Sequence, residues 1–200
     1  MRVSIIKKLI TGALAASMLM ASVIGVSATE TIVVSEVWAK ASTIGSVGGT
    51  RSTVGGVFFA QKVNGVAVTT PVASIAAAYG LQGNEKPYVK VLDMDPKKSY
   101  AAKAVIDFAA ASQGATVGPM LNIELGKMSG GKYSLLPSDG ADIRFAVGVP
   151  SKFAQAGRTY AVVCVRAGGE FAILPDLDEN PNTITFDTKG GAGAYAIIRY

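Results

Sequence analysis

An acidic segment near the C-terminus carries the side chains best suited to bind a cation. Asp176, Asp178 and Asn180 place side-chain oxygens at every second position, a pattern typical of calcium-binding loops. Asp187 falls at the twelfth position counted from Asp176, where the helix–loop–helix calcium motif has its last ligand. Pro181, however, stands where that motif requires glycine, and no helical pattern flanks the segment. Two interpretations stay open: a calcium site on Asp176, Asp178 and Asn180, or a turn between two strands.

Several other chemistries lack the residues that they need. The chain contains no histidine, which removes Ser-His-Asp and Cys-His nucleophiles and the histidine-based zinc sites. Its single cysteine, Cys164, excludes an intramolecular disulfide and stands in an apolar, β-branched run. That context favours a small buried hydrophobe over a reactive thiol or an intermolecular bridge.

Phosphate binding and carboxylate catalysis have weaker support. The glycine-rich residues 45–56 lack the Gly-Lys-Ser/Thr ending of a phosphate loop, so they are interpreted as a flexible segment. Paired carboxylates could hydrolyse glycosides, but nothing in the sequence pairs the candidates Asp93, Asp95, Glu124 and Asp142 across a cleft. We therefore expect a protein that is not an enzyme and that has no cofactor other than calcium.

The N-terminus has the pattern of an export signal. Arg2, Lys7 and Lys8 precede an apolar run over residues 9–26, which is followed by a small-x-small cleavage pattern. Residues 1–28 are therefore predicted to be a secretory signal peptide, with an uncleaved membrane anchor as the alternative. After cleavage the chain is expected to be extracellular, without membrane attachment or with a loose association with the cell surface.

The charge of the exported part argues against nucleic-acid binding. The whole chain has 19 basic and 14 acidic residues, a net charge of +5. Three of the basic residues lie in the predicted signal, which leaves 16 basic and 14 acidic residues, a net charge of +2. Lys97-Lys98 is the densest basic cluster, whereas phosphate tracking needs a basic stripe.

Residues 29–118 are predicted to mix strands with two helices. Residues 29–56 combine a strand at 31–38 with a segment rich in glycine, serine and threonine. An α+β part over residues 57–118 opens with a hairpin, because Asn64-Gly65 suits a two-residue turn. A further strand is expected at 88–92.

Both helices of this part begin at a capping residue followed by proline. Thr70 and Pro71 start the first helix, and Gly80 ends it. Asp95 is predicted to cap the second helix, which ends at Gly114. Its buried stripe is expected to be Ala101, Ala104, Val105, Phe108 and Ser112.

Residues 119–200 have the pattern of a β-sandwich. Strands are predicted at 120–125, 132–136, 142–149, 159–166, 170–174, 183–187 and 194–199, separated by glycine-containing turns. Residues 161–165 are apolar at every position, as in a strand buried on both faces. The predicted fold class is α+β: N-terminal strands with two helices, followed by an Ig-like antiparallel β-sandwich.

The C-terminal third contains a recurring set of short motifs. They are residues 157–166, Gly168-Gly169-Glu170, residues 182–188 and residues 193–198. This segment resembles a small C-terminal β-sandwich module of secreted and surface proteins of clostridia-like Gram-positive bacteria. The resemblance implies a stalk, spacer or adhesion-associated part without catalytic residues.

Three functions are therefore considered. The first is a secreted non-catalytic protein that binds an extracellular protein or glycan, or interacts with a surface. The second is an extracellular enzyme or inhibitor that uses carboxylates of the α+β part. The third is a structural subunit that assembles by strand addition through residues 31–38 and 194–200.

Overall fold

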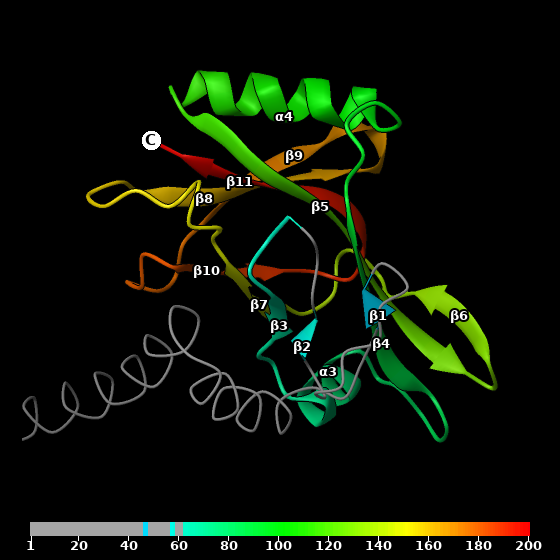
Figure 1. Cartoon of the computed structure of the whole chain (residues 1–200). Helices are drawn as coiled ribbons and strands as arrows, with labels where there is room; N and C mark the ends of the chain where they lie inside the picture. Colours follow the sequence, from blue (N-terminus) through cyan, green and yellow to red (C-terminus); the bar gives the residue numbers. More distant parts are fainter. Residues whose placement is uncertain (1–45, 48–56, 59–61) are drawn as a thin grey trace, which may run out of the picture.

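The computed structural model describes residues 46–47, 57–58 and 62–200, and shows two stacked β-sheets with two helices (Figure 1). The predicted α+β class is confirmed, and all but one of the described strand pairs are antiparallel. The predicted strand at 31–38 and most of the glycine-rich segment lie outside the described residues. Among those described, no helix is long and apolar enough to cross a bilayer.

Among the described residues, the larger sheet has seven strands and the smaller sheet has four. The larger one runs in the order β1 (Ser46–Val47), β4 (Lys86–Asp93), β5 (Thr116–Ser129), β11 (Gly191–Arg199), β8 (Tyr160–Arg166) and β9 (Phe171–Pro175), with β6 (Lys132–Leu135) also paired to β5. The smaller one runs β10 (Thr183–Thr188), β7 (Ile143–Gly148), β3 (Val66–Val68) and β2 (Val57–Phe58). Each of the seven strands predicted after residue 119 is present.

Strands from both predicted parts of the chain share these sheets. β4 pairs with β5 over eight residues, and β3 pairs with β7. Strands of residues 57–118 and 119–200 therefore share both sheets, and the apolar layer between the sheets contains residues of both parts.

Two apolar layers lie on opposite faces of the larger sheet. One fills the space between the sheets and includes Phe145 and Phe186. The other lies beneath helix α4 (Tyr100–Ser112), which covers the outer face of the larger sheet (Figure 1). β8 contributes Val162 to the first layer and Val163 to the second, so the prediction of a strand buried on both faces is confirmed.

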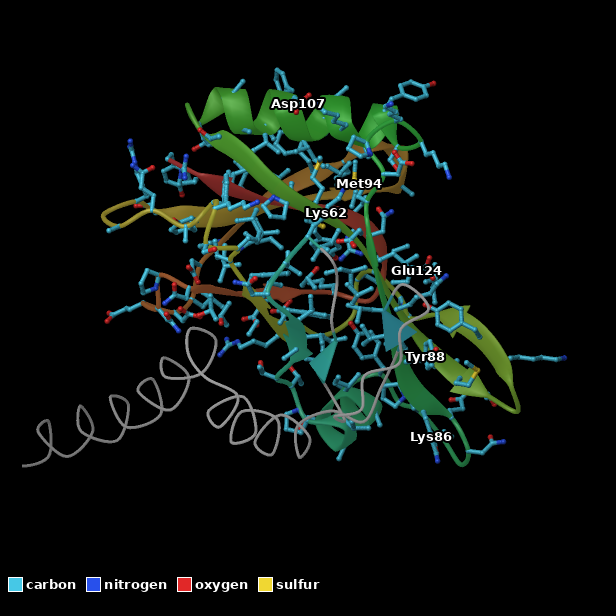
Figure 2. All side chains as sticks on the ribbon, viewed as in Figure 1. Lys62, Lys86, Tyr88, Met94, Asp107 and Glu124 are labelled. Carbon is cyan, nitrogen blue, oxygen red and sulfur yellow. The ribbon has the colours of Figure 1, made fainter. Side chains whose placement is uncertain are left out.

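The predicted start and buried stripe of α4 are wrong. Asp95 caps a preceding turn instead: its Oδ1 accepts a hydrogen bond from the Lys97 N–H at 2.9 Å, and the helix begins at Tyr100. The buried residues of the helix are Ile106, Ala109 and Ala110. The small alanines let the helix approach the sheet closely, whereas Phe108 is 65% exposed. Figure 2 shows Met94 beneath α4 and Asp107 on the helix itself.

The predicted two-residue hairpin turn is also wrong. Phe58 pairs with Val66, so the loop between β2 and β3 is longer than Asn64-Gly65 alone. These two residues extend the pairing with β7: the Asn64 N–H donates to the Gly148 carbonyl at 3.0 Å, and the Gly148 N–H donates to the Gly65 carbonyl at 3.0 Å. Bonding to β7 satisfies backbone groups that a tight turn would have left to water.

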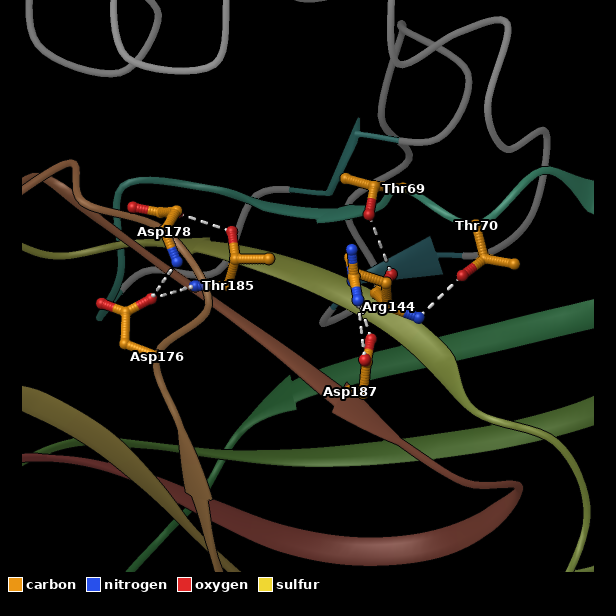
Figure 3. Close-up of polar contacts among 7 residues, drawn as sticks. All are labelled: Thr69, Thr70, Arg144, Asp176, Asp178, Thr185 and Asp187. Carbon is orange, nitrogen blue, oxygen red and sulfur yellow. Dashed lines mark hydrogen bonds and ion pairs between the residues drawn. The ribbon is translucent and has the colours of Figure 1, made fainter. Parts of the chain in front are cut away.

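Helix α3 (Val72–Ala78) ends as predicted but is not capped as predicted. Gly80 adopts a φ of +61°, and the Leu81 N–H donates to the Ala76 carbonyl at 2.9 Å, which closes the helix. Thr70 Oγ1 accepts a hydrogen bond from the Arg144 N–H of β7 at 2.7 Å (Figure 3). The threonine therefore joins the helix start to the smaller sheet rather than capping the helix.

Candidate functional site

A groove of about 560 Å³ opens between the two sheets, beside the edge strand β9. Its roof is the inner face of β8, β9 and β11, and the connection after β6 and the end of β10 line the rest. The lining residues are Leu135, Leu136, Ser138, Asp142, Cys164, Arg166, Ala167, Glu170, Phe171, Ala172, Leu174, Asp187, Thr188, Lys189, Gly191 and Ala192.

Apolar side chains form much of the groove's surface. Leu136 and Cys164 are buried and belong to the layer between the sheets, and Leu174 packs against that layer. Burial raises the pKa of the Cys164 thiol, so the thiolate needed for nucleophilic attack is disfavoured. The interpretation of Cys164 as a small buried hydrophobe is confirmed.

Arg166 holds the turn between β10 and β11 at one side of the groove. Its Nη1 donates to the carbonyls of Gly190 at 3.0 Å and Ala192 at 3.3 Å. Its Nη2 donates to Thr188 Oγ1 at 2.9 Å and to the Lys189 carbonyl at 3.0 Å. The guanidinium group is thus occupied by the fold, and it positions the wall rather than reaching for a ligand.

The charges that remain available around the groove are mainly acidic. Within the described part of the chain, Asp142, Glu170 and Lys189 have side chains without a hydrogen-bond or ion-pair partner. Asp187 is bound by Arg144, with Nε–Oδ1 and Nη2–Oδ2 distances of 2.8 Å (Figure 3). Arg166 keeps its positive charge, because its acceptors are neutral oxygens, but its N–H groups are already bonded. The carboxylates of Asp142 and Glu170 are therefore the unpaired acceptors to which a basic group of a ligand could bind.

Tyr79 fixes the connection between β6 and β7, which contributes Leu136, Ser138 and Asp142 to the groove. Its Oη donates to the Ala141 carbonyl at 2.6 Å and accepts from the Gly190 N–H at 2.9 Å. Gly140 lies so close that an added Cβ would stand 2.3 Å from Tyr79 Cε1. The position of the Tyr79 ring therefore requires glycine at residue 140.

Gly140→Ala is expected to lower the free energy of unfolding by about 2–3 kcal/mol, because the methyl group must displace the Tyr79 ring and break both of its hydrogen bonds. Chemical denaturation measures the change. Tyr79→Phe is the matched control: it removes the two bonds without the clash and is expected to cost about 1–2 kcal/mol. A smaller loss for Gly140→Ala than for Tyr79→Phe would contradict the close packing.

The structure brings the predicted cation ligands together in the crossover from β9 to β10. Asp176 Oδ1 accepts hydrogen bonds from the Thr185 N–H at 2.9 Å and the Asp178 N–H at 3.2 Å (Figure 3). Asp178 Oδ1 accepts from the Asn180 N–H at 2.7 Å, and Asp178 Oδ2 accepts from Thr185 Oγ1 at 2.6 Å. The same oxygens that would bind calcium therefore stabilise the crossover.

Calcium binding by Asp176, Asp178 and Asn180 stays a prediction. Among the residues that the structure describes, no three acidic or thiol side chains form a metal-binding group. A calcium ion would have to replace the hydrogen bonds that Asp178 accepts from Thr183 and Thr185.

Burial in the crossover raises the pKa of Asp176 to about 6, although the N–H groups of Thr185 and Asp178 oppose this shift. The folded chain thus keeps a proton on Asp176 at a pH where the unfolded chain has lost it. The stability contributed by this group is present below the unfolded pKa near 4 and is lost as the pH rises to about 6.

Asp176→Asn is expected to leave stability unchanged near pH 4 and to raise the free energy of unfolding by about 1–2 kcal/mol at pH 7. The amide oxygen can still accept from Thr185, and it carries no charge to bury. Denaturation at both pH values measures this. Asp187→Asn is the control of opposite sign, because Arg144 lowers the pKa of Asp187, whose contribution is lost as the pH falls. A variant of Asp176 that is equally destabilised at both pH values would contradict the prediction.

The other carboxylates singled out in the sequence lie in different places. Asp93 Oδ1 accepts from the Lys62 N–H at 3.1 Å, and Glu124 lies 3.5 Å from Lys90 Nζ. Lys62 and Glu124 are both labelled in Figure 2. Asp95 caps the turn before α4. Of these four carboxylates, only Asp142 lines the groove.

Sequence reasoning missed the groove, although one signal was present. Arg166 directly follows the apolar run of β8, and a charged residue at the end of a buried strand indicates a polar task. Lys189 and Glu170 carry no comparable signal, because each resembles an ordinary turn residue.

No protein-family model, curated protein sequence or solved structure matches this chain.

Proposed function

We propose that this chain is a secreted, non-catalytic binding protein whose ligand occupies the groove beside β9. The observation that carries the proposal is the combination of a largely apolar hollow of about 560 Å³ with unpaired charged side chains among its lining residues. Pockets of this size and mixed lining are typical of ligand sites. The partner would be an extracellular protein or glycan, and the export pattern of residues 1–28 supports that location.

The resemblance of the C-terminal third to modules of Gram-positive surface proteins supports a role in surface interaction. We also assign the sandwich to the Ig-like class as part of this proposal. Two facing sheets of largely antiparallel strands support the assignment.

One observation favours a carboxylate enzyme as a second candidate. Asp142 and Asp187 both line the groove, and both also line a shallower hollow beside Thr70 and Arg144. The ion pair with Arg144 lowers the pKa of Asp187, which would keep that group ionised as a base or nucleophile. Loss of a glycosidase activity in Asp142→Asn, with binding retained, would favour this candidate.

The strand-addition alternative loses one of its two predicted segments. β11 lies between β5 and β8 and pairs with both, so residues 194–199 have no free edge to offer a neighbour. Residues 31–38, the other segment, lie outside the described residues.

The test compares binding of the wild-type protein with that of a variant whose groove is filled. The full-length chain is expressed in a secreting host, and the processed protein is tested on a glycan array and in cell-wall pull-downs, with and without calcium. Ala172→Trp places a large ring in the groove, while Ala101→Trp adds the same ring on the exposed side of α4. Saturable binding that Ala172→Trp abolishes and Ala101→Trp retains supports the proposal. Equal binding by all three proteins, or by none, contradicts it.

A further inference from the structure

β9 ends the larger sheet, and the edge that faces away from β8 is unpaired in the described structure. The Arg166 N–H donates to the Glu170 carbonyl at 2.8 Å, which fixes the alternation of the β8–β9 ladder. Ala172 and Leu174 therefore bond to β8, while the N–H and C=O groups of Phe171 and Ile173 point outward.

Pro175 supports this alternation independently. It is the next residue after Ile173 whose backbone points outward, and it has no N–H to leave unpaired. Natural edge strands are usually protected by charge, a bulge or a covering segment. β9 itself reads Phe-Ala-Ile-Leu-Pro and carries no charge, so its outward donors and acceptors stay available to another extended backbone.

Apolar surface lies on both faces of this edge. On the outer face, Phe108 of α4 and Phe171 are 65% and 39% exposed, and their ring centroids lie 6.2 Å apart in an edge-to-face contact. On the inner face, Ala172 and Leu174 line the groove together with Leu135. Because the side chains of a strand alternate between faces, an added strand would meet the aromatic pair with one set and the groove with the other.

The charges at the inner face indicate which side chain would enter the groove. Glu170 directly precedes β9 and Asp142 directly precedes β7 of the smaller sheet, and both line the groove. Lys189 is the single free ammonium group among the lining residues, since Arg166 is occupied by the β10–β11 turn. A basic side chain in the groove could thus pair with the carboxylate of Glu170 or Asp142.

We propose that β9 binds an extended peptide segment of a partner protein as an additional strand, with alternate apolar side chains on Phe108 and Phe171 and one basic side chain in the groove. The backbone bonds to Phe171 and Ile173 would supply affinity, and the groove would supply specificity. This inference rests on the groove being the binding site proposed above, and it names the class of ligand.

The probe is a heptapeptide of alternating valine and threonine with blocked ends, in which lysine replaces the central threonine. It is titrated calorimetrically into the protein that the host secretes from the full-length chain. Successive N–H groups of a strand point in opposite directions. N-methylation of one alternate set of residues is therefore expected to weaken binding at least tenfold, while N-methylation of the other set changes it less than threefold. Equal effects of the two sets would overturn strand addition.

Variants of the protein test the two halves of the proposal. Phe171→Pro removes an outward N–H group but no hydrogen bond to β8. It is expected to weaken binding of the lysine peptide at least tenfold. Glu170→Lys is expected to shift preference from the lysine peptide to one with glutamate at the same position. Tyr100→Ala, at a 77% exposed aromatic residue at the start of α4, is the control and should bind normally. Circular dichroism and thermal unfolding verify that each variant is folded.

Two outcomes would separate this inference from the function proposed above. Groove-dependent capture of extracellular material, without binding of any peptide probe, overturns the peptide class and keeps the binding function. Loss of both overturns both. A dimer in sedimentation that Phe171→Pro dissociates would assign the β9 edge to a second copy of this chain and overturn the peptide as its occupant.

Discussion

Phe145→Ala is expected to lower the free energy of unfolding by about 3–5 kcal/mol, the largest loss that we expect from a single core truncation. Phe145 of β7 is fully buried, and its ring stacks on Phe186 of β10 with centroids 5.8 Å apart and an interplanar angle of 14°. Phe186 in turn contacts Tyr195 of β11, at 5.9 Å. The stack therefore joins the smaller sheet to the centre of the larger one, and alanine would leave a cavity between them.

Phe108→Ala is the matched control, because it makes the same truncation at a ring that is 65% exposed. Phe108→Ala should lower the free energy of unfolding by less than about 1 kcal/mol, since folding of the chain removes little of the Phe108 side chain from water. Urea denaturation followed by circular dichroism measures both variants. Similar losses for Phe145→Ala and Phe108→Ala would contradict the placement of the core between the sheets.

A double-mutant cycle tests the stack itself. Phe145→Ala combined with Phe186→Ala is expected to cost less than the two single losses added, because the second truncation removes a ring that has already lost its partner. The coupling should be about 0.5–1.5 kcal/mol. Strict additivity would mean that the two rings contribute independently to the core.

The strands were predictable from local patterns, because each has a period or an apolar run that its turns delimit. β8 is the clearest case: residues 161–165 are apolar throughout, and only a layer on each face can bury such a strand. The pairing of the strands was not predictable, since β4 and β3 of the predicted α+β part pair with β5 and β7 of the predicted sandwich. That choice depends on contacts between residues far apart in the chain.

The face of α4 was not predictable for a different reason. The helix carries alanine on several sides, so more than one stripe has similar apolar character. Ala109 and Ala110 belong to the same buried layer as Ala161 and Ala196 of the sheet, and small residues on both elements allow close approach. Phe108 lies outside that layer, and it contacts Phe171 at the edge of the sheet.

The acidic segment and the groove also differ in how far the sequence alone could predict them. Asp176, Asp178 and Asn180 stand close together in the sequence, so their shared location was predicted, although their hydrogen bonds to Thr185 and its neighbours were not. The groove assembles Leu135, Arg166 and other residues from separate turns and strands. No local pattern relates such residues, because only the closed sandwich brings them together.

Arg166→Leu is expected to lower the free energy of unfolding by about 2–4 kcal/mol. The substitution keeps an aliphatic side chain at the end of β8 but removes the four hydrogen bonds that Arg166 donates to Thr188 Oγ1 and to the carbonyls of Lys189, Gly190 and Ala192. Acceptors in a partly buried turn lose more when their partner disappears than the net value of each bond.

Arg166→Lys is expected to recover less than half of that loss, because one ammonium group cannot reach acceptors that the guanidinium fork reaches from two nitrogens. Arg144→Leu is the matched control. It also removes a two-bonded guanidinium group, but the Arg144 side chain is 50% exposed and its partner Asp187 is in contact with water. Its loss should be below about 1 kcal/mol and should shrink in high salt.

The comparison separates a structural cation from a surface ion pair. Arg166 also lies over the Tyr195 ring at 5.8 Å, so its removal should loosen the end of the core as well as the turn. Hydrogen exchange would then rise at Lys189, Gly190 and Ala192 in Arg166→Leu and stay normal in Arg144→Leu. Equal stability of the two variants would mean that the turn holds itself, and that the guanidinium group is free to serve a ligand of the groove.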